Sequence, residues 1–316
     1  VFVYPVLGFL GIAGNVVTGI ILRRSGLEKP TNVLLLALAI SSISCLLPTV
    51  NIFSLLRQFN KMIPPRYYIA WEYEPGKSRF AYFCFHATTF IFFQSRYGNQ
   101  VTSSICVLIT LERLVVIFFP MRIKSIITLK RTVAVVIFVH LLWLPLLVLN
   151  IRACKARVIY FDDVETYGLL LSFEENDLLT NIGQVADWLS GIIPVTVIFL
   201  GTVTMSVKLR FILKNRRRLT SSLRGTHSLR LSKTLIVVCV LFCLCHMNAF
   251  IFLFKTFYNN ENRLMGKIII MFSYVESASH FLVYIFLNKN FRSVICVLAV
   301  CYGSVFWQNV YFHHAD

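Results

Sequence analysis

Residues 131–150 read RTVAVVIFVHLLWLPLLVLN, and this stretch decides the fold of the chain. Apart from Arg131 at its start it carries no charged residue, and a helix of this length rises about 30 Å, the thickness of the hydrocarbon core of a bilayer. Lipid offers no hydrogen-bond partner to a backbone amide, so such a stretch is stable there only as a helix. The stretch therefore predicts a membrane-spanning helix.

Six further segments have the same length and apolar character. Together they give seven predicted spans, at approximately residues 1–22, 31–55, 80–113, 131–150, 181–213, 232–258 and 265–288. The composition agrees, because 57% of the 316 residues are hydrophobic and only 14% are charged, with a mean hydropathy of +0.72. We therefore predict an all-α membrane protein. A seven-helix bundle occupies residues 1–288, and residues 289–316 form a short amphipathic interfacial helix and a short cytoplasmic tail.

The formal net charge of +17 is concentrated in the connections between the predicted spans. Basic residues gather at 23–30, 114–130 and 208–233 and after the last span, which are all connections on one side of the membrane. The positive-inside rule makes that side cytoplasmic and places the amino terminus outside, as in a multi-pass protein of the plasma membrane. The basic residues form no face with interleaved aromatics, so the lipid bilayer is the expected partner and nucleic acid is not. Because the first span starts at Val1, we expect this sequence to begin downstream of the native amino terminus.

The connection at 151–180 lies on the outer side in this topology. It contains two runs rich in β-branched and aromatic residues, 155–161 and 167–173, around the polar turn 162–166. This pattern predicts a β-hairpin, which we expect to form a lid over the bundle.

The cysteines fall on both sides of the membrane and inside the spans. Cys84 and Cys154 are the two on the oxidising outer side, so a disulfide from the third span to the lid is favoured over two free thiols. Cys296 and Cys301 follow the last span and are candidates for palmitoylation, although cysteines in an apolar stretch are packing residues at least as often. No metal site is predicted, because no second pair of ligands faces the cysteines of the sixth span, Cys239, Cys243 and Cys245.

A series of short motifs occurs in order along the predicted spans. They are Gly14-Asn15, Asn32-x-x-Leu35-x-x-Leu38-Ala39, Leu111-Glu112-Arg113-Leu114 followed by Pro120, Trp143, Pro194, Phe242-x-x-Cys245, and Tyr284 followed by Phe291-Arg292. In this order they resemble the rhodopsin-like, or class A, G-protein-coupled receptors, and the overall texture is most similar to invertebrate peptide or chemosensory receptors. The resemblance implies a receptor that passes the binding of an extracellular ligand, a peptide or a chemosensory small molecule, to a heterotrimeric G protein. It also implies that Glu112 and Arg113 form a latch, for which the alternative is an arginine that reaches to lipid phosphates.

Two positions depart from the family pattern at its sodium site. Ser42 stands where the family has an Asp in the second span, and His280 stands at the Asn of the family's Asn-Pro-x-x-Tyr motif. The family's Asp and Asn help to hold a sodium ion. The anionic anchor for sodium is therefore expected to be absent from this chain.

The sixth span departs from the family pattern as well. His246 and Asn248 replace the family's Trp and Pro, and without the Pro the helix lacks its usual hinge. We expect His246 and Asn248, together with Tyr284, to form the moving part of the receptor. A receptor-like protein with degenerate motifs, which binds partners without coupling, stays an alternative.

The candidate ligand site is a polar stretch of the third span. Arg96 lies seventeen residues before Arg113, about 25 Å further out along a helix. The residues assigned to this site are Gln94, Ser95, Arg96, Asn99, Asp187, His246 and Glu276. Arg96 either attracts an anionic ligand group or is neutralised by Asp187 or Glu276, and neutralisation is favoured because an unpaired buried cation is costly.

Two positions at which the chain departs from known receptor classes exclude certain ligands and cofactors. Ser95 stands where amine receptors have an Asp, and Tyr274 stands where opsins have the Lys that binds retinal. The resemblance therefore implies no amine ligand and no cofactor, and leaves a peptide, an acidic metabolite or a waterborne odorant. A transporter or channel is the less favoured alternative, because no internal repeat is evident. An enzyme is not predicted, because no nucleophile, base and orienting group recur at a recognisable spacing.

Overall fold

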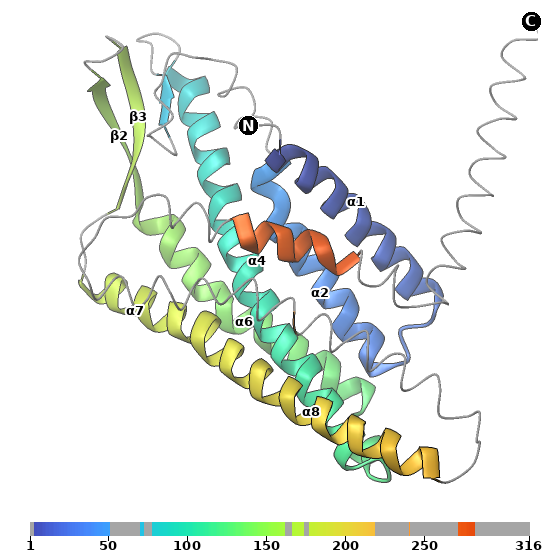
Figure 1. The fold of residues 1–316 in the computed structure, drawn as a ribbon. Coiled ribbons are helices and arrows are strands. Elements are labelled where there is room, and N and C mark those ends of the chain that lie inside the picture. Colours follow the sequence, from blue (N-terminus) through green and yellow to red (C-terminus); the bar gives the residue numbers. More distant parts are fainter. Residues whose placement is uncertain are drawn as a thin grey trace, which may run out of the picture.

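The computed structural model describes residues 3–50, 70–72, 78–161, 166–173, 177–218, 240 and 271–281. It consists mainly of long helices with a small sheet at one end, here called the sheet end (Figure 1). The long helices are α1 (Val3–Arg24), α2 (Pro30–Leu46), α4 (Ser78–Phe118), α6 (Leu129–Ala153) and α8 (Ile193–Arg218). The shorter helical elements are η1 (Leu47–Val50), α5 (Ile123–Ile126), α7 (Asp177–Asp187), η3 (Trp188–Ile192) and residues 271–281.

Five helices of the described chain are long and apolar enough to cross a membrane. They cover Val3–Arg24, Pro30–Val50, Arg79–Phe118, Leu129–Ala153 and Asn181–Lys208. These helices coincide with the first five predicted spans. The sixth, 232–258, lies outside the described residues except for Val240, and the described part of the seventh, 271–281, is helical.

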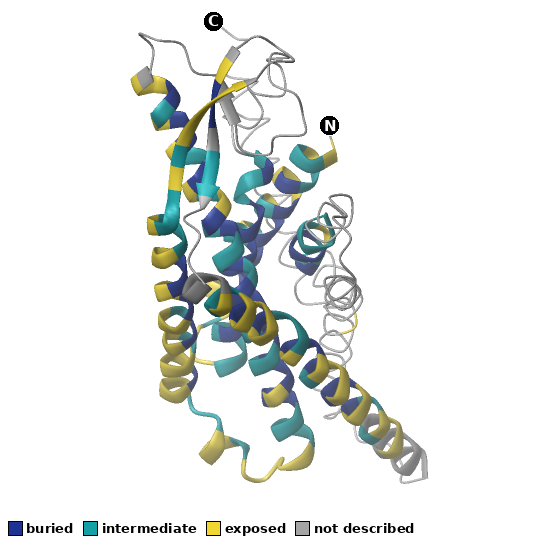
Figure 2. Cartoon of the chain, turned by 90° about the vertical axis from the view of Figure 1, so that its left-hand side faces the viewer, coloured by how far each residue is buried: buried dark blue, intermediate teal, exposed yellow. Residues whose placement is uncertain are grey.

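The outward faces of the helices are apolar. On α6, Phe138 and Leu141 are 62% and 59% exposed, whereas Trp143 is 5% exposed. Figure 2 shows the same division between buried and exposed faces along the neighbouring helices. Hydrocarbon is as apolar as these side chains, so they have no reason to turn inward in a bilayer. The described helices therefore present the surface of a membrane-spanning bundle.

α4 is the central helix and packs against α2, α6 and α8. Val101, Ile105 and Ile109 are buried on it at intervals of four residues, so they line one face of the helix. Polar contacts add to this packing. Trp143 on α6 donates from Nε1 to the hydroxyl of Ser104 on α4 at 3.0 Å, which gives the fourth-span tryptophan of the sequence motif a structural role.

Strands β2 (Cys154–Phe161) and β3 (Thr166–Phe173) form an antiparallel pair in which Cys154 lies opposite Phe173 and Phe161 opposite Thr166. The predicted hairpin is confirmed. A third strand, β1 (Ala70–Glu72), pairs with the other edge of β3 and was not predicted. Leu169 of β3 is buried against Ala81 and Phe85 of α4, so the sheet covers that end of the central helix.

The fifth predicted span is interrupted by a wider turn. η3 is a π-helical turn between α7 and α8, and the backbone N–H of Ile193 donates to the carbonyl of Trp188. Pro194 follows at once and has no N–H to continue the α-helical pattern. A π turn beside a proline moves the next helical turn sideways, which offsets α7 from α8.

Glycine allows the closest approach between α4 and α2. A Cβ atom at Gly98 would lie 2.8 Å from the backbone nitrogen of Cys45 and 2.9 Å from the carbonyl oxygen of Ser41. Backbone atoms cannot move aside as a flexible side chain can. Small residues at helix contacts are a common means of packing membrane helices tightly.

We predict that Gly98→Ala lowers the melting temperature of the purified protein. Overpacking costs roughly 1–3 kcal/mol, which outweighs the gain of up to about 1 kcal/mol in helix propensity. Gly183→Ala in α7 is the matched control, because a Cβ there meets nothing within 4 Å. Equal melting temperatures for the two variants would show that α2 and α4 are not in close contact at Gly98.

Candidate functional site

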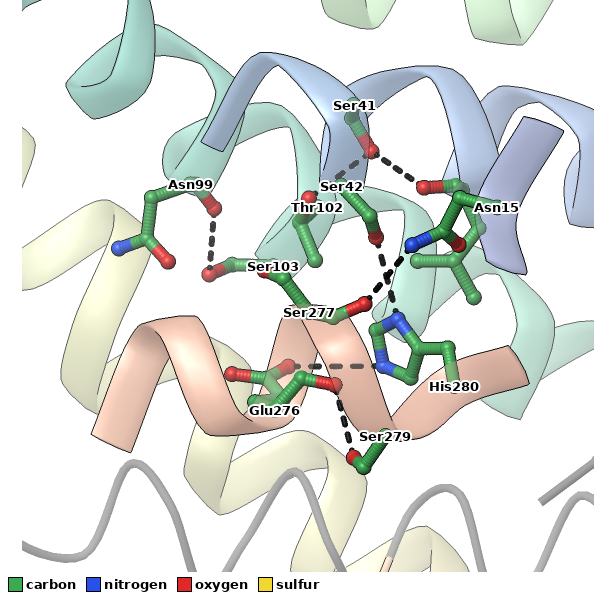
Figure 3. A network of polar contacts seen from close by, with 11 residues as sticks. Asn15, Ser41, Ser42, Asn99, Thr102, Ser103, Glu276, Ser277, Ser279 and His280 are labelled. Atoms are coloured by element: carbon green, nitrogen blue, oxygen red, sulfur yellow. Dashed lines mark hydrogen bonds and ion pairs between the residues drawn. The ribbon is translucent and has the colours of Figure 1, made fainter. Parts of the chain in front are cut away.

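A belt of polar side chains crosses the interior where α1, α2, α4 and the helical segment 271–281 meet (Figure 3). Asn15 on α1 donates from Nδ2 to the carbonyl oxygen of Ser277 at 3.0 Å. Thr102 on α4 donates its hydroxyl hydrogen to the hydroxyl of Ser41 on α2 at 2.8 Å. These bonds connect helices at a depth where lipid supplies no hydrophobic drive for association.

The centre of this belt is a buried acid beside a histidine. His280 Nε2 lies 3.8 Å from Glu276 Oε1, and His280 Nδ1 lies 3.1 Å from the hydroxyl oxygen of Ser42 on α2. All three residues are 0–1% exposed. Ser42 thus stands at the place of the family's Asp, and its hydroxyl contacts His280. The carboxyl group nearest to His280 comes from Glu276 in the helical segment 271–281.

A cysteine of α4 lies next to this pair. Each of Cys106, Glu276 and His280 offers one ligand atom, and these atoms all lie within 4.8 Å of one another. We call these three residues the interior triad. Sequence patterns do not reveal it, because nothing in the local spacing of α4 shows which of its residues faces the seventh helix. The sequence did contain one signal of this group. Glu276 and His280 are four residues apart, which places both on one face of a helix.

Glu112 and Arg113 form a second buried group, at the end of the bundle opposite the sheet. They are 7% and 4% exposed, and Arg113 Nη2 lies 3.8 Å from Glu112 Oε2. Thr31, near the start of α2, donates its hydroxyl hydrogen to Glu112 Oε1 and accepts a hydrogen bond from Arg113 Nη2 at 3.2 Å. We call these three residues the latch cluster. An arginine that reached to lipid phosphates would be exposed, so this burial favours the latch over its alternative, and Thr31 is a member that the sequence did not indicate.

Arg96 lies nearer the sheet end and pairs with an acid. Arg96 Nη2 lies 2.7 Å from Asp187 Oδ1, and the two side chains are 40% and 54% exposed. The predicted neutralisation of Arg96 by an acid of the chain is confirmed, with Asp187 as the partner. Glu276 is buried beside His280 instead. A half-exposed ion pair contributes only about 0–1 kcal/mol to stability, so it can open without a large cost.

The other predicted ligand residues of α4 face different surroundings. Ser95 is buried and donates its hydroxyl hydrogen to the carbonyl oxygen of Cys45 at 2.7 Å, which ties α4 to α2. Gln94 and Asn99 are partly exposed. The backbone carbonyl of Asn99 accepts a hydrogen bond from Ser103 at 3.0 Å. The structure therefore leaves Gln94, Arg96 and Asn99 accessible and gives Ser95 a packing role.

Several of the residues predicted from the sequence lie outside the described part of the chain. They are the switch residues His246, Asn248 and Tyr284 and the palmitoylation candidates Cys296 and Cys301. Their assignments stay predictions.

The two cysteines predicted to lie on the outer side are Cys84, on α4, and Cys154, the first residue of β2. Both are free thiols in the structure. Cys154 lies beside Thr89, and burial raises the pKa of its thiol to about 11. Thr89 is five residues after Cys84, about 7.5 Å further along a helix. A Cys84–Cys154 bridge therefore requires β2 to shift along α4, and it stays a prediction.

The chain was compared with families of known proteins. The family model described as "Serpentine type 7TM GPCR chemoreceptor Srw" matches residues 2–302. The chain belongs to this family. The match extends over all seven predicted spans of this Srw family member, including those that the structure describes only in part. The family is one of receptors and is not generally enzymatic, and no curated protein sequence matched the chain.

Peptide mapping without reduction tests the predicted bridge. Free thiols are blocked in denaturant, because the partly buried Cys154 thiol, with a pKa of about 11, is mostly protonated and reacts slowly at neutral pH in the folded protein. We expect a cross-linked peptide that contains Cys84 and Cys154. Recovery of both residues in alkylated form would contradict the prediction and support the free thiols of the structure.

Proposed function

We propose that this Srw family member is a rhodopsin-like chemoreceptor that binds a ligand at the sheet end and engages a heterotrimeric G protein at the latch end. The observation that carries the proposal is the buried latch cluster of Thr31, Glu112 and Arg113. In this proposal, Arg113 is held by Thr31 and Glu112 in one arrangement of the helices and is released in another. Such a group can bias a two-state equilibrium between helix arrangements.

The proposed orientation places the sheet end outside the cell and the latch end in the cytoplasm. The basic residues support it, because they follow α1, α4 and α8 at the ends remote from the sheet. The long basic connection that follows α8 in the sequence would then be on the cytoplasmic side, where a G protein docks. The carboxy terminus would also be cytoplasmic.

The proposed ligand carries an anionic group and is an acidic metabolite, a waterborne odorant or a peptide with such a group. Arg96 supplies the cation, and Asp187 holds it in the absence of ligand. Because both side chains are about half exposed, an incoming anion can displace Asp187 without first entering a buried site. Asn99, three residues after Arg96, lies on the same face of α4 and offers a further hydrogen-bond partner, whereas Gln94, two residues before Arg96, lies on another face.

We predict opposite effects from two changes in the latch cluster. Thr31→Val removes the hydroxyl that joins Glu112 to Arg113 and should raise ligand-independent signalling. Hydrogen bonds to charged groups are worth roughly 1.5–3 kcal/mol, which permits a shift of tenfold or more in the state equilibrium. Arg113→Ala should abolish coupling. A second-messenger assay with a promiscuous G protein, normalised to surface expression, measures both effects.

Thr196→Val is the matched control, because Thr196 is exposed and its hydroxyl donates to the carbonyl oxygen of Ile192, one turn earlier, at 2.9 Å. Unchanged basal signalling in Thr31→Val, with normal expression, would remove the latch cluster from the mechanism. Absence of signalling from the wild-type protein with every ligand would favour the alternative of a receptor-like protein that does not couple.

We also predict that Arg96→Ala and Asp187→Asn have opposite effects on potency. Screening of acidic compounds through the same reporter identifies an active ligand. Arg96→Ala should then lower potency by at least about tenfold, as expected for loss of a bond between charged groups. Asp187→Asn should raise potency, because it removes the competitor for Arg96. Both variants should reach the cell surface, since the pair is half exposed, and unchanged potency in both would exclude this site.

A further inference from the structure

The interior triad has the composition of a metal site. Cys106, Glu276 and His280 are almost completely buried, and their ligand atoms lie within 4.8 Å of one another. They come from α4 and from the helical segment 271–281, so the group joins two elements far apart in the sequence. A sulfur, a carboxylate oxygen and an imidazole nitrogen are thus collected at one point inside a membrane bundle (Figure 3 shows the acid and the histidine).

We propose that the interior triad binds one Zn²⁺ ion. Zn²⁺ takes thiolate, imidazole and carboxylate ligands, and sites with three protein ligands keep a fourth position for water. Tetrahedral bonds of about 2.0–2.3 Å place ligand atoms about 3.3–3.8 Å apart. The ligand atoms of the triad therefore have to move about 1 Å closer together when the ion binds. A thiolate ligand selects Zn²⁺ over the hard cations Na⁺, Mg²⁺ and Ca²⁺, which prefer oxygen.

The charges of the triad match those of the ion. The Glu276 carboxylate and the Cys106 thiolate balance Zn²⁺, and a neutral His280 leaves the cluster with no net charge. The thiol proton of Cys106 passes to water when the metal binds. A neutral cluster avoids the high cost of an uncompensated charge in the interior.

Ser42 supplies the second contact that a metal-binding histidine usually has. Its hydroxyl oxygen lies 3.1 Å from His280 Nδ1 and can accept the N–H of that nitrogen. This bond fixes the ring with Nε2 on the side of Glu276. The residue that replaces the family's Asp thereby becomes a support for the histidine ligand.

A bound ion would hold α4 and the seventh helix in the described arrangement. In a receptor that works by rearranging helices, Zn²⁺ would then oppose activation. This consequence rests on the proposed function. The binding of Zn²⁺ does not, and the experiment therefore measures binding in the purified protein.

The test uses the full chain, purified in detergent without a polyhistidine tag and freed of metal with a chelator. Zn²⁺ is added, and bound metal per chain is measured together with thermal unfolding by tryptophan fluorescence. We expect one Zn²⁺ per chain and a raised melting temperature, because a ligand that binds the folded state stabilises it. Co²⁺ serves as the spectroscopic substitute and should produce a thiolate-to-metal charge-transfer band.

Variants assign the ligands. Cys106→Ser, Glu276→Gln and His280→Asn should each weaken Zn²⁺ binding by at least tenfold, and Ser42→Ala by about 10–100-fold. Cys106→Ser should also remove the charge-transfer band. Cys45→Ser is the matched control, because Cys45 is a buried thiol that also lies near Glu276. His140→Asn, at a histidine bonded to Tyr97 on another face of α4, controls for the imidazole.

Three results would overturn the proposal. They are a wild-type protein that binds no stoichiometric Zn²⁺, a protein that is stabilised by Na⁺ but not by Zn²⁺, and a charge-transfer band that survives in Cys106→Ser. Should a ligand variant fail to fold, the wild-type titration and the Cys45→Ser control still decide. Loss of signalling with intact Zn²⁺ binding would count against the proposed function alone.

Discussion

Hydrocarbon accepts no hydrogen bond, and this constraint arranges the rest of the molecule. Backbone amides are satisfied within helices, and polar side chains are satisfied against neighbouring helices. Apolar side chains such as Phe138 and Leu141 face outward. The interior consequently holds hydrogen-bonded polar side chains among its apolar ones. Asn15, Thr102 and Trp143 each hold one helix to another through a hydrogen bond that lipid could not replace.

This inward polarity places ionisable side chains at two depths along the bundle. The latch cluster lies at the end remote from the sheet, and the interior triad lies nearer the middle, with Cys106 seven residues before Arg113 on α4. A buried carboxylate is present in each group, and each is shared between α4 and another helix. Movement of α4 would therefore disturb both groups. A receptor that links the two sides of a membrane requires such a connection.

The sequence predicted the elements better than their contacts. Hydropathy located Leu129–Ala153 to within a few residues of its expected bounds, and β-prone runs located the hairpin, because both signals are local. The contact of Ser42 with His280 joins positions 238 apart, and no local pattern encodes it. Glu276 was assigned to the ligand site from its depth in the membrane alone. Depth does not show which neighbour a side chain faces, so the contact of Glu276 with His280 was not predicted. Thr31 was missed for the same reason.

Orientation is the claim on which the division into a ligand end and a coupling end depends. An epitope inserted between β2 and β3 and a second one inserted after Arg218, in separate variants, measure it by antibody binding to intact and permeabilised cells. We expect the first epitope to be detected on intact cells and the second only after permeabilisation. The reverse pattern would place Arg113 outside the cell and contradict the proposed receptor function.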